Sequence, residues 1–424
     1  MIYFKSGSEN TILNSRDVEA GISTALGKLG KREKVLVVPP DCTRIHSRAG
    51  EITSYIYKYY NNSLKDVLPA LGTHTPMTDG QIHEMFRGVP KSLFRIHDWR
   101  KDVVTVGTVP GEFVSLITGG ALEYSWPAQL NRLVFNGGHD LILSVGQVVP
   151  HEVIGMANYN KNLFVGTGGH ESINKSHFIG AVYGMERIMG RAENPVRSLL
   201  NYASANFAGH LPVVYVHTVI GRDAGGELVM RGLFIGDDEE VFTLAADLSL
   251  KVNFNILDKP LNKVVVHLDQ AEFKSMWVGN KSIYRTRMAM ADNGELIVLA
   301  PGLKEFGEDP EIDRLIRKYG YRGTPETLKS VKENEELNRN LSAAAHLIHG
   351  STEGRFSVTY CPGSLTQEEI ESVNFKYHDL NNMMKKYNPE KLKEGFNTLD
   401  DGQEIFYISN PALGLWSSKQ RLAE

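Results

Sequence analysis

The densest group of potentially reactive side chains lies between residues 151 and 191. His151 is followed by Lys161 ten residues later and by His177 sixteen residues after that, and the glycine-rich run 166–169 separates the last two. Imidazole titrates near neutral pH and transfers protons or binds metal ions, and a lysine amine can anchor a ligand covalently. Glycine-rich loops can bind a phosphate through backbone N–H groups, although more of them are simple turns. This segment is the first candidate active site.

Three apolar runs are predicted to be buried strands that end in polar loops. They span residues 34–38, 67–71 and 141–145, and short continuous apolar runs are typical of parallel strands covered on both faces. In an α/β sheet, the loops at the carboxyl ends of the strands share one edge, where ligands bind. We therefore expect the polar residues after the runs to converge: Asp41 and Arg44 after the first, His74 after the second and His151 after the third.

Helical patterns alternate with these strands. Apolar residues recur at helical spacing between residues 50 and 60, and Thr78 is the predicted N-cap of a helix over residues 79–86. A further apolar pattern over residues 178–189 predicts a helix with His177 in its first turn. The repeated order of strand, loop and helix indicates the α/β class.

A second domain is predicted beyond residues 250–262, where the sequence becomes polar and irregular. Further buried strands are predicted at residues 263–267 and 295–300, with a helix-like stretch over residues 282–291 between them. The chain has 424 residues, more than one hydrophobic core usually serves. The expected fold is two α/β domains, with the active site in the cleft between them. Residues 1–255 form the catalytic and cofactor-binding domain, and residues 262–424 close the substrate cleft.

Composition excludes several classes of protein. Hydrophobic residues make up 42% and charged residues 23% of the chain, which matches an ordinary globular protein. The net charge is −4 and the basic residues are dispersed, so we expect no nucleic-acid partner. No signal sequence or apolar stretch of membrane-spanning length is visible, so we expect a cytoplasmic protein with no membrane partner.

Most of the remaining histidines and both cysteines are interpreted as structural. Cys42 and Cys361 are too few for a disulfide framework or a thiolate metal cluster. His346 and His349 lie three residues apart on a predicted helix, so both occupy one face and a pocket or metal role stays open. The histidines assigned to the surface or to the core are His83, His97, His210, His217 and His378.

The segments that carry these candidates resemble the nickel-dependent lactate racemase family. Three motifs occur in the order found there: residues 41–44, residues 72–74, and residues 141–155 followed by Lys161 and His177 at the spacing given above. The resemblance covers most of residues 30–190 and is weaker beyond them.

The resemblance implies an isomerase, a racemase or epimerase of 2-hydroxy acids that uses a nickel pincer nucleotide. This cofactor is pyridinium-3-thioamide-5-thiocarboxylic acid mononucleotide with nickel, and its maturation requires cofactor-synthesis proteins. In the family it is tethered through a lysine that matches Lys161, and nickel takes a protein ligand from the histidine that matches His177. The other implied assignments are His74 and His151 as acid/base pair, Asp41 orienting a histidine, Arg44 and Lys281 for substrate and catalysis, and Thr43, Gly168, Gly169 and Trp277 for cofactor binding.

These residue types suit the implied reaction. The C2 hydrogen of a 2-hydroxy acid is weakly acidic beside an ionised carboxylate, so its removal as hydride avoids a carbanion. Each enantiomer then needs its own base for the hydroxyl proton, and two imidazoles fit that need. An arginine fork such as Arg44 binds both oxygens of a carboxylate, and a neutral imidazole suits nickel.

The second domain departs from the family's pattern. Where the family has a tyrosine and glutamine pair followed by a lysine, the best alignment here gives Trp277, Val278 and Lys281. The substrate is therefore left open between small aliphatic acids and longer sugar acids. A polar set of unassigned role lies nearby in the sequence and consists of Arg285, Arg287, His346, His349 and Arg355.

Two other functions remain possible from the sequence. One is a zinc hydrolase with His74, His151 and His177 as ligands, although no His-x-x-Glu-His motif is present and Lys161 would have no task. The other is a non-catalytic nucleotide-binding or cofactor-carrying protein. The oligomeric state is not predicted.

Overall fold

A computed structural model describes residues 1–423, which group into two compact units. Unit 1 consists of residues 1–179 and 187–253, and unit 2 of residues 180–186 and 254–424, of which the last described is residue 423. The predicted domains were each a single continuous segment. The short excursion of residues 180–186 into unit 2 has no counterpart in that prediction, because nothing in its composition distinguishes it.

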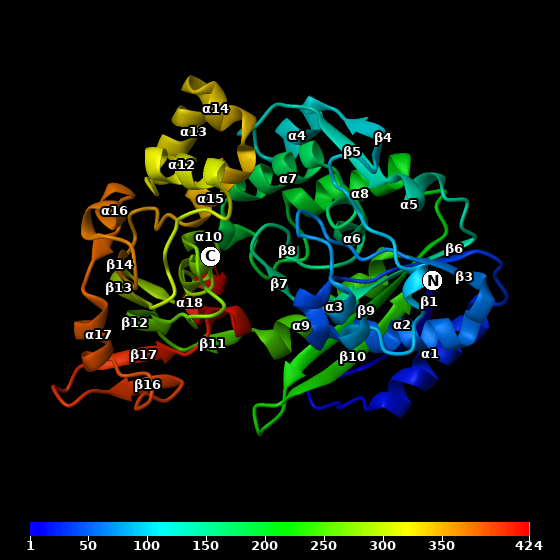
Figure 1. Ribbon diagram of the computed structural model, residues 1–424, viewed down its shortest axis with the longest axis horizontal. Helices are drawn as coiled ribbons and strands as arrows, with labels where there is room; N and C mark the ends of the chain where they lie inside the picture. Colours follow the sequence, from blue (N-terminus) through cyan, green and yellow to red (C-terminus); the bar gives the residue numbers. More distant parts are fainter. Residues whose placement is uncertain (424) are drawn as a thin grey trace. The chain divides into compact units, whose positions relative to one another are not determined.

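Unit 1 is built on a six-stranded sheet in the order β1-β10-β9-β6-β2-β3 (Figure 1). The strands β3, β2, β6 and β9 run parallel, and β9, β10 and β1 are antiparallel neighbours. The strands are β1 (Ile2–Gly7), β2 (Val35–Val38), β3 (Leu64–Val67), β6 (Leu141–Gln147), β9 (Val213–Arg222) and β10 (Leu228–Gly236).

The strands β2 and β6 lie where the sequence predicts them, but β3 ends where its predicted strand begins. Residues 67–71 contain Pro69, which has no N–H to donate to a ladder. Beyond Val67 the chain is joined to the neighbouring segment by hydrogen bonds from Leu68 N–H to Val37 O at 2.9 Å and from Ala70 N–H to Pro39 O at 2.7 Å, and by an isolated bridge between Ala70 and Pro40. The prediction of a strand at residues 67–71 is therefore wrong in its bounds, since β3 starts three residues and ends four residues earlier, although the exit loop still carries His74.

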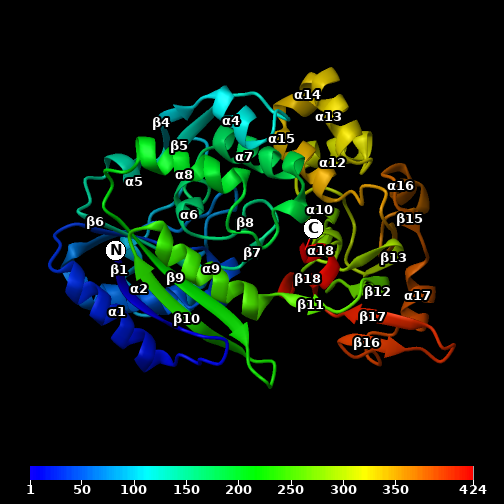
Figure 2. The ribbon, with the colours of Figure 1, turned by 180° about the vertical axis from the view of Figure 1, so that it is seen from behind.

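Two layers of helices cover the sheet of unit 1. The helices α1 (Ser15–Leu29) and α2 (Ala49–Tyr60) pack through residues such as Ile22 and Ile56 against alternate strand residues, including Val35 and Leu143. On the other face, α9 (Glu239–Asn253) lies along β9 and β10 (Figure 2). There Phe242 contacts the ring of His217 of β9.

The other elements of unit 1 form hairpins and short helices around the strand ends. The hairpins pair β4 with β5 and β7 with β8. Helix α3 has the predicted Thr78 capping box. The elements are η1 (Cys42–Ser47), η2 (Asn61–Ser63), α3 (Asp79–Met85), η3 (Lys91–Leu93), β4 (Val103–Val109), α4 (Gly111–Ile117), β5 (Trp126–Asn131), α5 (Arg132–Asn136), β7 (Pro150–His151), β8 (Gly155–Met156), α6 (Asn160–Phe164), α7 (His170–Tyr183), η4 (Met185–Arg187) and α8 (Pro195–Phe207).

Helix α7 begins seven residues earlier than predicted, so His177 lies in its middle and the first-turn prediction is wrong. The buried side chains of its first half include Ser172 and Ser176, which an apolar pattern does not register. The helix ends at Tyr183, before Gly184 with a φ of +105°. The apolar pattern continues past this point because Ile188 and Met189 are buried outside a helix.

Unit 2 is also built on a six-stranded sheet, in the order β15-β14-β13-β12-β17-β16. All neighbours are parallel except β16 and β17, and a separate parallel pair joins β11 to β18. The strands are β11 (Asn255–Leu257), β12 (Leu261–His267), β13 (Met290–Ala300), β14 (Ser357–Pro362), β15 (Lys376–Tyr377), β16 (Gly395–Thr398), β17 (Glu404–Ile408) and β18 (Trp416–Ser418).

The predicted helix at residues 282–291 is only partly correct. Helix α11 ends at Tyr284, and β13 starts at Met290, within the predicted helix. Met288, Ala289 and Met290 are all buried, and a short apolar run buried on every side has no periodicity that separates helix from strand.

The helices of unit 2 lie between and around its strands. They are α10 (Met276–Gly279), α11 (Lys281–Tyr284), α12 (Pro310–Tyr319), α13 (Thr324–Glu333), α14 (Glu335–Arg339), α15 (Leu341–His349), α16 (Gln367–Ser372), α17 (Leu380–Lys386), η5 (Pro411–Leu413) and α18 (Lys419–Ala423). Among residues 1–423, none of the helices has both the length and the apolar character needed to span a membrane. With both units built on mainly parallel sheets flanked by helices, the predicted α/β class is confirmed.

Candidate active site

Asp41 and His74 form a hydrogen-bonded pair at the strand ends of unit 1. Asp41 caps η1, is 5% exposed, and accepts a hydrogen bond from the Thr43 backbone N–H at 3.1 Å. The Thr43 hydroxyl and the Nδ1–H of His74 also donate to this carboxylate, the latter at 2.6 Å. Burial alone would raise the pKa of Asp41, but the His74 and Thr43 hydrogen bonds lower it below its ordinary value.

The loop that carries His74 is held by Gly72. This residue has a φ of +56°, in the left-handed region that glycine favours, and its N–H donates to Gly166 O at 2.8 Å. Because the Nδ1–H of His74 is directed to Asp41, its Nε2 carries the lone pair. The His74 side chain is 59% exposed, so this nitrogen is accessible to a ligand and can accept a proton.

His151 has the opposite arrangement at Nδ1. It lies in the β7–β8 hairpin, and its Nδ1 accepts the backbone N–H of Val153 at 3.1 Å. A neutral ring in this position carries its proton on Nε2. The Glu152 carboxylate lies 3.9 Å from the same Nδ1. Burial lowers the pKa of His151 well below its ordinary value, against the opposing charge of Glu152.

Lys161 is a partly buried lysine on the short helix α6. Burial lowers its pKa to about 8, and the positive charge of Arg44 contributes to the shift. At pH 7 a lysine with this pKa is about a tenth neutral, against a few parts in ten thousand for an ordinary lysine. Lys161 therefore has more of the nucleophilic form than an exposed lysine.

His177 presents one nitrogen to its surroundings. Its Nδ1–H donates to Ile173 O, one turn earlier in α7, at 2.7 Å, so the lone pair is on Nε2. Burial lowers its pKa to about 4, and the Lys161 charge adds to the shift. A neutral imidazole fixed through one nitrogen to a carbonyl is the usual arrangement of a metal-binding histidine.

Electrostatic interactions connect these side chains. Arg44 and Glu152 both act on His151 and Lys161, and Glu152 also acts on His177. Unit 1 therefore brings the N-terminal candidates into one neighbourhood. Glu152 was missed in the sequence, where its position directly after His151 was the only available signal.

The glycine-rich run has its N–H groups engaged inside the protein. Gly168 N–H donates to Val165 O at 3.3 Å, and Gly169 N–H to Ser172 Oγ at 3.2 Å. A Cβ on Gly168 would lie 1.9 Å from Phe164 O, and one on Gly169 would lie 2.4 Å from Gln129 Oε1. The two glycines therefore allow close packing here, and their role in binding a cofactor phosphate stays a prediction.

In unit 2, Trp277 is held by a buried histidine. The rings of Trp277 and His346 stack at 4.2 Å between centroids, and the Tyr321 hydroxyl donates to His346 Nε2 at 3.0 Å. Burial lowers the pKa of His346 to about 3, so it is a neutral packing partner. Lys281 follows on α11, with its Nζ 5.8 Å from the Phe273 ring centroid.

The unassigned arginines of unit 2 have structural contacts. Glu186 accepts hydrogen bonds from Arg287 Nε at 3.1 Å and from Arg355 Nη1. Arg287 also donates to His349 O at 3.4 Å, and Arg285 O accepts the N–H of Trp416 at 3.0 Å.

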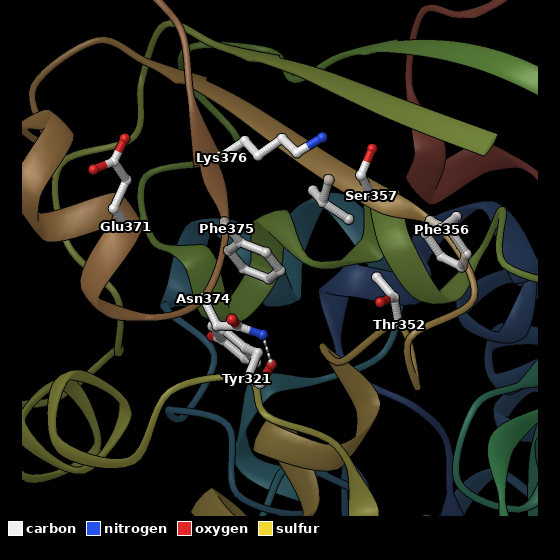
Figure 3. Close-up of a pocket in the computed structure, with 9 residues that line it drawn as sticks. Tyr321, Thr352, Phe356, Ser357, Glu371, Asn374, Phe375 and Lys376 are labelled. Atoms are coloured by element: carbon white, nitrogen blue, oxygen red, sulfur yellow. Dashed lines mark hydrogen bonds between the residues drawn. The ribbon is translucent and has the colours of Figure 1, made fainter. Parts of the chain in front are cut away.

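A separate cavity of about 310 Å³ lies at the β14–β15 edge of the unit 2 sheet (Figure 3). Its lining includes Tyr321, Phe375 and Lys376, with Asn374 bonded to Tyr321 O. None of the predicted site residues lines it. Across residues 1–423, no three His, Cys, Asp or Glu side chains gather closely enough to hold a metal ion.

Comparison with known proteins identifies the N-terminal part of the chain. Residues 20–188 match the family model of the lactate racemase N-terminal domain, which confirms the resemblance seen in the three motifs. None of the curated proteins compared with the chain matches it.

Two solved structures share the fold over nearly the whole chain. A Thermotoga maritima protein solved by structural genomics has a TM-score of 0.79 at 25% identity, with 98% of this chain and 100% of that chain covered. The lactate racemase apoprotein from Thermoanaerobacterium thermosaccharolyticum has a TM-score of 0.64 at 17% identity, with 97% and 91% covered.

Proposed function

Since residues 20–188 form a lactate racemase N-terminal domain, we propose that this protein inverts C2 of a 2-hydroxy acid. The match of residues 20–188 supports a lactate racemase-like activity, and the substrate, cofactor and residue roles that follow are our proposal. The observation that carries it is His177, whose Nδ1–H donates to Ile173 O at 2.7 Å and leaves Nε2 for a ligand, beside the amine of Lys161, whose charge acts on this ring.

His74 is the proposed base for one enantiomer. Its Nε2 lone pair is accessible, and a proton accepted there makes an imidazolium that the Asp41 carboxylate stabilises through Nδ1. Asp41 also fixes the tautomer, since its second role as cap of η1 holds the carboxylate in place.

His151 is the proposed partner for the other enantiomer. In its neutral form the Nε2–H is a hydrogen-bond donor to a substrate oxygen. It becomes a base when its proton moves to Nδ1, which gives up the hydrogen bond from the Val153 N–H and places the new N–H beside the Glu152 charge at 3.9 Å. Glu152 would then support His151 as Asp41 supports His74.

Arg44 is the proposed carboxylate ligand. It follows Asp41 on η1, and its charge acts on both His151 and Lys161. A guanidinium fork holds a carboxylate by two hydrogen bonds, which would orient C2 between the two histidines. We also propose that Trp277 and Lys281 contact the substrate or cofactor.

Lys161 and His177 fit a covalently anchored nickel nucleotide. An amine with a lowered pKa suits a covalent link, and His177 offers one metal ligand with its tautomer fixed. His177 would supply a protein ligand to the metal, and Lys161 would anchor the nucleotide. When bound, the nickel pincer nucleotide would supply a hydride acceptor for C2, while His74 and His151 would hold the hydroxyl proton. Maturation would need cofactor-synthesis proteins.

The zinc hydrolase is the weaker candidate. It needs His74, His151 and His177 as joint ligands, yet within residues 1–423 no three His, Cys, Asp or Glu side chains lie close enough together to hold a metal ion. A zinc hydrolase would also give Lys161 no role.

The test is production with and without the cofactor-synthesis proteins, followed by a chirality-resolved assay. The substrates are a panel of small 2-hydroxy acids and aldonic acids. Intact mass should show a nucleotide-sized adduct that maps to Lys161 and is lost in Lys161→Ala but kept in Lys175→Ala. Stoichiometric zinc, no adduct and no exchange on any acid would refute the proposal.

A further inference from the structure

Arg197 is a buried arginine directed at the segment that precedes Lys161. It is 2% exposed, on α8. Its Nη2 donates to Met156 O at 2.7 Å and its Nη1 to Asn158 O at 3.4 Å, and Nη1 also donates to the Asn160 side-chain oxygen. The guanidinium lies 4.4 Å from the Phe242 ring centroid. Within residues 1–423 it has no carboxylate within ion-pair distance.

The segment that Arg197 contacts has a strained backbone. Asn158 and Tyr159 have φ of +67° and +58°, a region that residues other than glycine rarely occupy. Such conformations persist only where the surroundings hold them. Asn158 Nδ2 is in turn held by Gly146 O at 2.7 Å and His217 Nδ1 at 3.0 Å.

Lys161 lies between two asparagines that are both fastened to the core. The side-chain oxygen of Asn160 accepts a hydrogen bond from Arg197 Nη1, and its Nδ2 donates to Asn201 Oδ1 at 2.7 Å. Asn162 Nδ2 donates to Val38 O and Ser144 Oγ, both at 3.0 Å. The position of the Lys161 backbone is therefore set from both sides, and Arg197 supplies the contacts on the N-terminal side.

We propose that Arg197 is the positioning residue of Lys161: it holds residues 156–160 in their strained conformation and so fixes where the Lys161 amine lies at the site. Only the role of the Lys161 amine as cofactor anchor rests on the proposed function. The geometry itself can be tested in the protein without cofactor.

The charge of Arg197 also lowers the pKa of Lys161. Burial is the main cause of the lowered pKa of Lys161, Arg44 contributes next, and Arg197 adds to them, while Glu152 and Asp41 oppose. A second buried cation beside Lys161 favours the neutral amine.

The first measurement is hydrogen exchange of peptides covering residues 156–166 in the apoprotein. Exchange should be about tenfold faster or more in Arg197→Met, since several hydrogen bonds from a charged group are lost. Arg197→Lys keeps the charge without the planar fork and should fall between this variant and wild type. Arg231 is the matched control, because it is also buried and donates to backbone carbonyls, those of Thr11 and Arg222. Arg231→Met should leave residues 156–166 unchanged.

The second measurement is the pH profile of Lys161 acetylation by acetic anhydride, with the exposed Lys58 as internal reference. The midpoint for Lys161 should lie near 8 in wild type and rise in the order wild type, Arg197→Lys, Arg197→Met. Wild-type exchange and midpoint in Arg197→Met would overturn the inference, as would an equal change in Arg231→Met. If Arg197→Met does not fold, Arg197→Lys decides by the same two criteria. Adduct formation at Lys161 is scored separately, so a protein that never carries cofactor refutes the proposed function and leaves this inference intact.

Discussion

At the scale of single residues, the two proposed bases differ in what faces Nδ1. His74 donates this proton to Asp41 at 2.6 Å, whereas His151 accepts the Val153 N–H at 3.1 Å. The sequence placed both histidines after strands, but it carried no information on tautomers, because those depend on backbone groups and on a carboxylate that only the fold brings close. Asp41 as the partner of a histidine was inferred through the resemblance, and the hydrogen bond to His74 supports that role.

Asp41→Asn should reduce turnover of the cofactor-loaded enzyme by about 100-fold or more, the scale of a lost acid/base contribution. The amide no longer stabilises the imidazolium of His74. The measurement is kcat in both directions by chiral chromatography, together with adduct content.

A matched control exists in the same unit. Asp66 accepts hydrogen bonds from the buried His139 at 2.9 Å and from Arg95 Nε at 2.8 Å, and neither partner is a proposed site residue. Asp66→Asn should lower stability while turnover per loaded molecule is kept. Equal losses of turnover in the two variants would show that the Asp41 effect is structural.

At the scale of elements, the sequence predicted best where a continuous apolar run ends in a polar loop or where apolar residues recur at helical spacing. The strands β2, β6 and β12 and the helices α2 and α3 lie where apolar spacing and capping indicate. The failures have physical causes. Pro69 cannot donate to a ladder, so β3 ends early. The first half of α7 buries serines, which an apolar pattern does not register, and Met288 to Met290 are all buried, so their sequence has no periodicity that distinguishes helix from strand. Hairpin β7–β8, which positions His151, consists of two-residue strands too short to leave a pattern.

Helix α7 links the two units, since His177 belongs to unit 1 and residues 180–186 to unit 2. The segment that follows α7 contains Glu186, which accepts hydrogen bonds from Arg287 and Arg355. Burial would raise the pKa of Glu186, but these two charges lower it below its ordinary value. This stabilisation is therefore present at neutral pH and is lost as the pH falls below the ordinary pKa of Glu toward the lowered one.

Glu186→Gln should destabilise unit 2 by about 2 kcal/mol, because Arg287, 4% exposed in its side chain, loses its counter-charge. Hydrogen exchange of unit 2 peptides at neutral pH measures this, and peptides over residues 180–186 should show the largest increase. Asp258→Asn, which breaks the exposed pair with Lys419, should have no such effect. If Asp258→Asn destabilises unit 2 as much as Glu186→Gln does, the effect of Glu186→Gln does not come from the burial of Arg287.

At the scale of the whole molecule, composition and length indicated two α/β bodies, and unit 1 and unit 2 have that class. The crossing of residues 180–186 between units could not be predicted, because it depends on long-range ion pairs and not on local composition. Likewise the sequence assigned His217 to surface or core without deciding which, and it is fully buried on β9.

Buried neutral histidines should make the folded protein sensitive to mild acid. Burial lowers the pKa of His177 to about 4 and the pKa values of His217 and His346 to about 3, against an unfolded value of about 6.5. Below pH 6.5 the unfolded chain binds protons that the folded chain does not. The contribution of these neutral rings to the free energy of unfolding is therefore complete above pH 6.5 and is lost as the pH falls toward 4 and 3.

His217→Gln tests this linkage without touching a proposed site residue. As the pH falls below 6.5, each such group contributes a slope of up to about 1.4 kcal/mol per pH unit to the unfolding free energy. Urea unfolding of unit 1, followed at pH 7.5, 6.5 and 5.5, should give a shallower loss on acidification in His217→Gln than in wild type, whatever its stability at pH 7.5. The exposed His83 provides the control, since His83→Gln should retain the wild-type slope. An unchanged slope in His217→Gln would mean that this ring is protonated equally in both states, contrary to its burial among Tyr215, Tyr159 and Phe242.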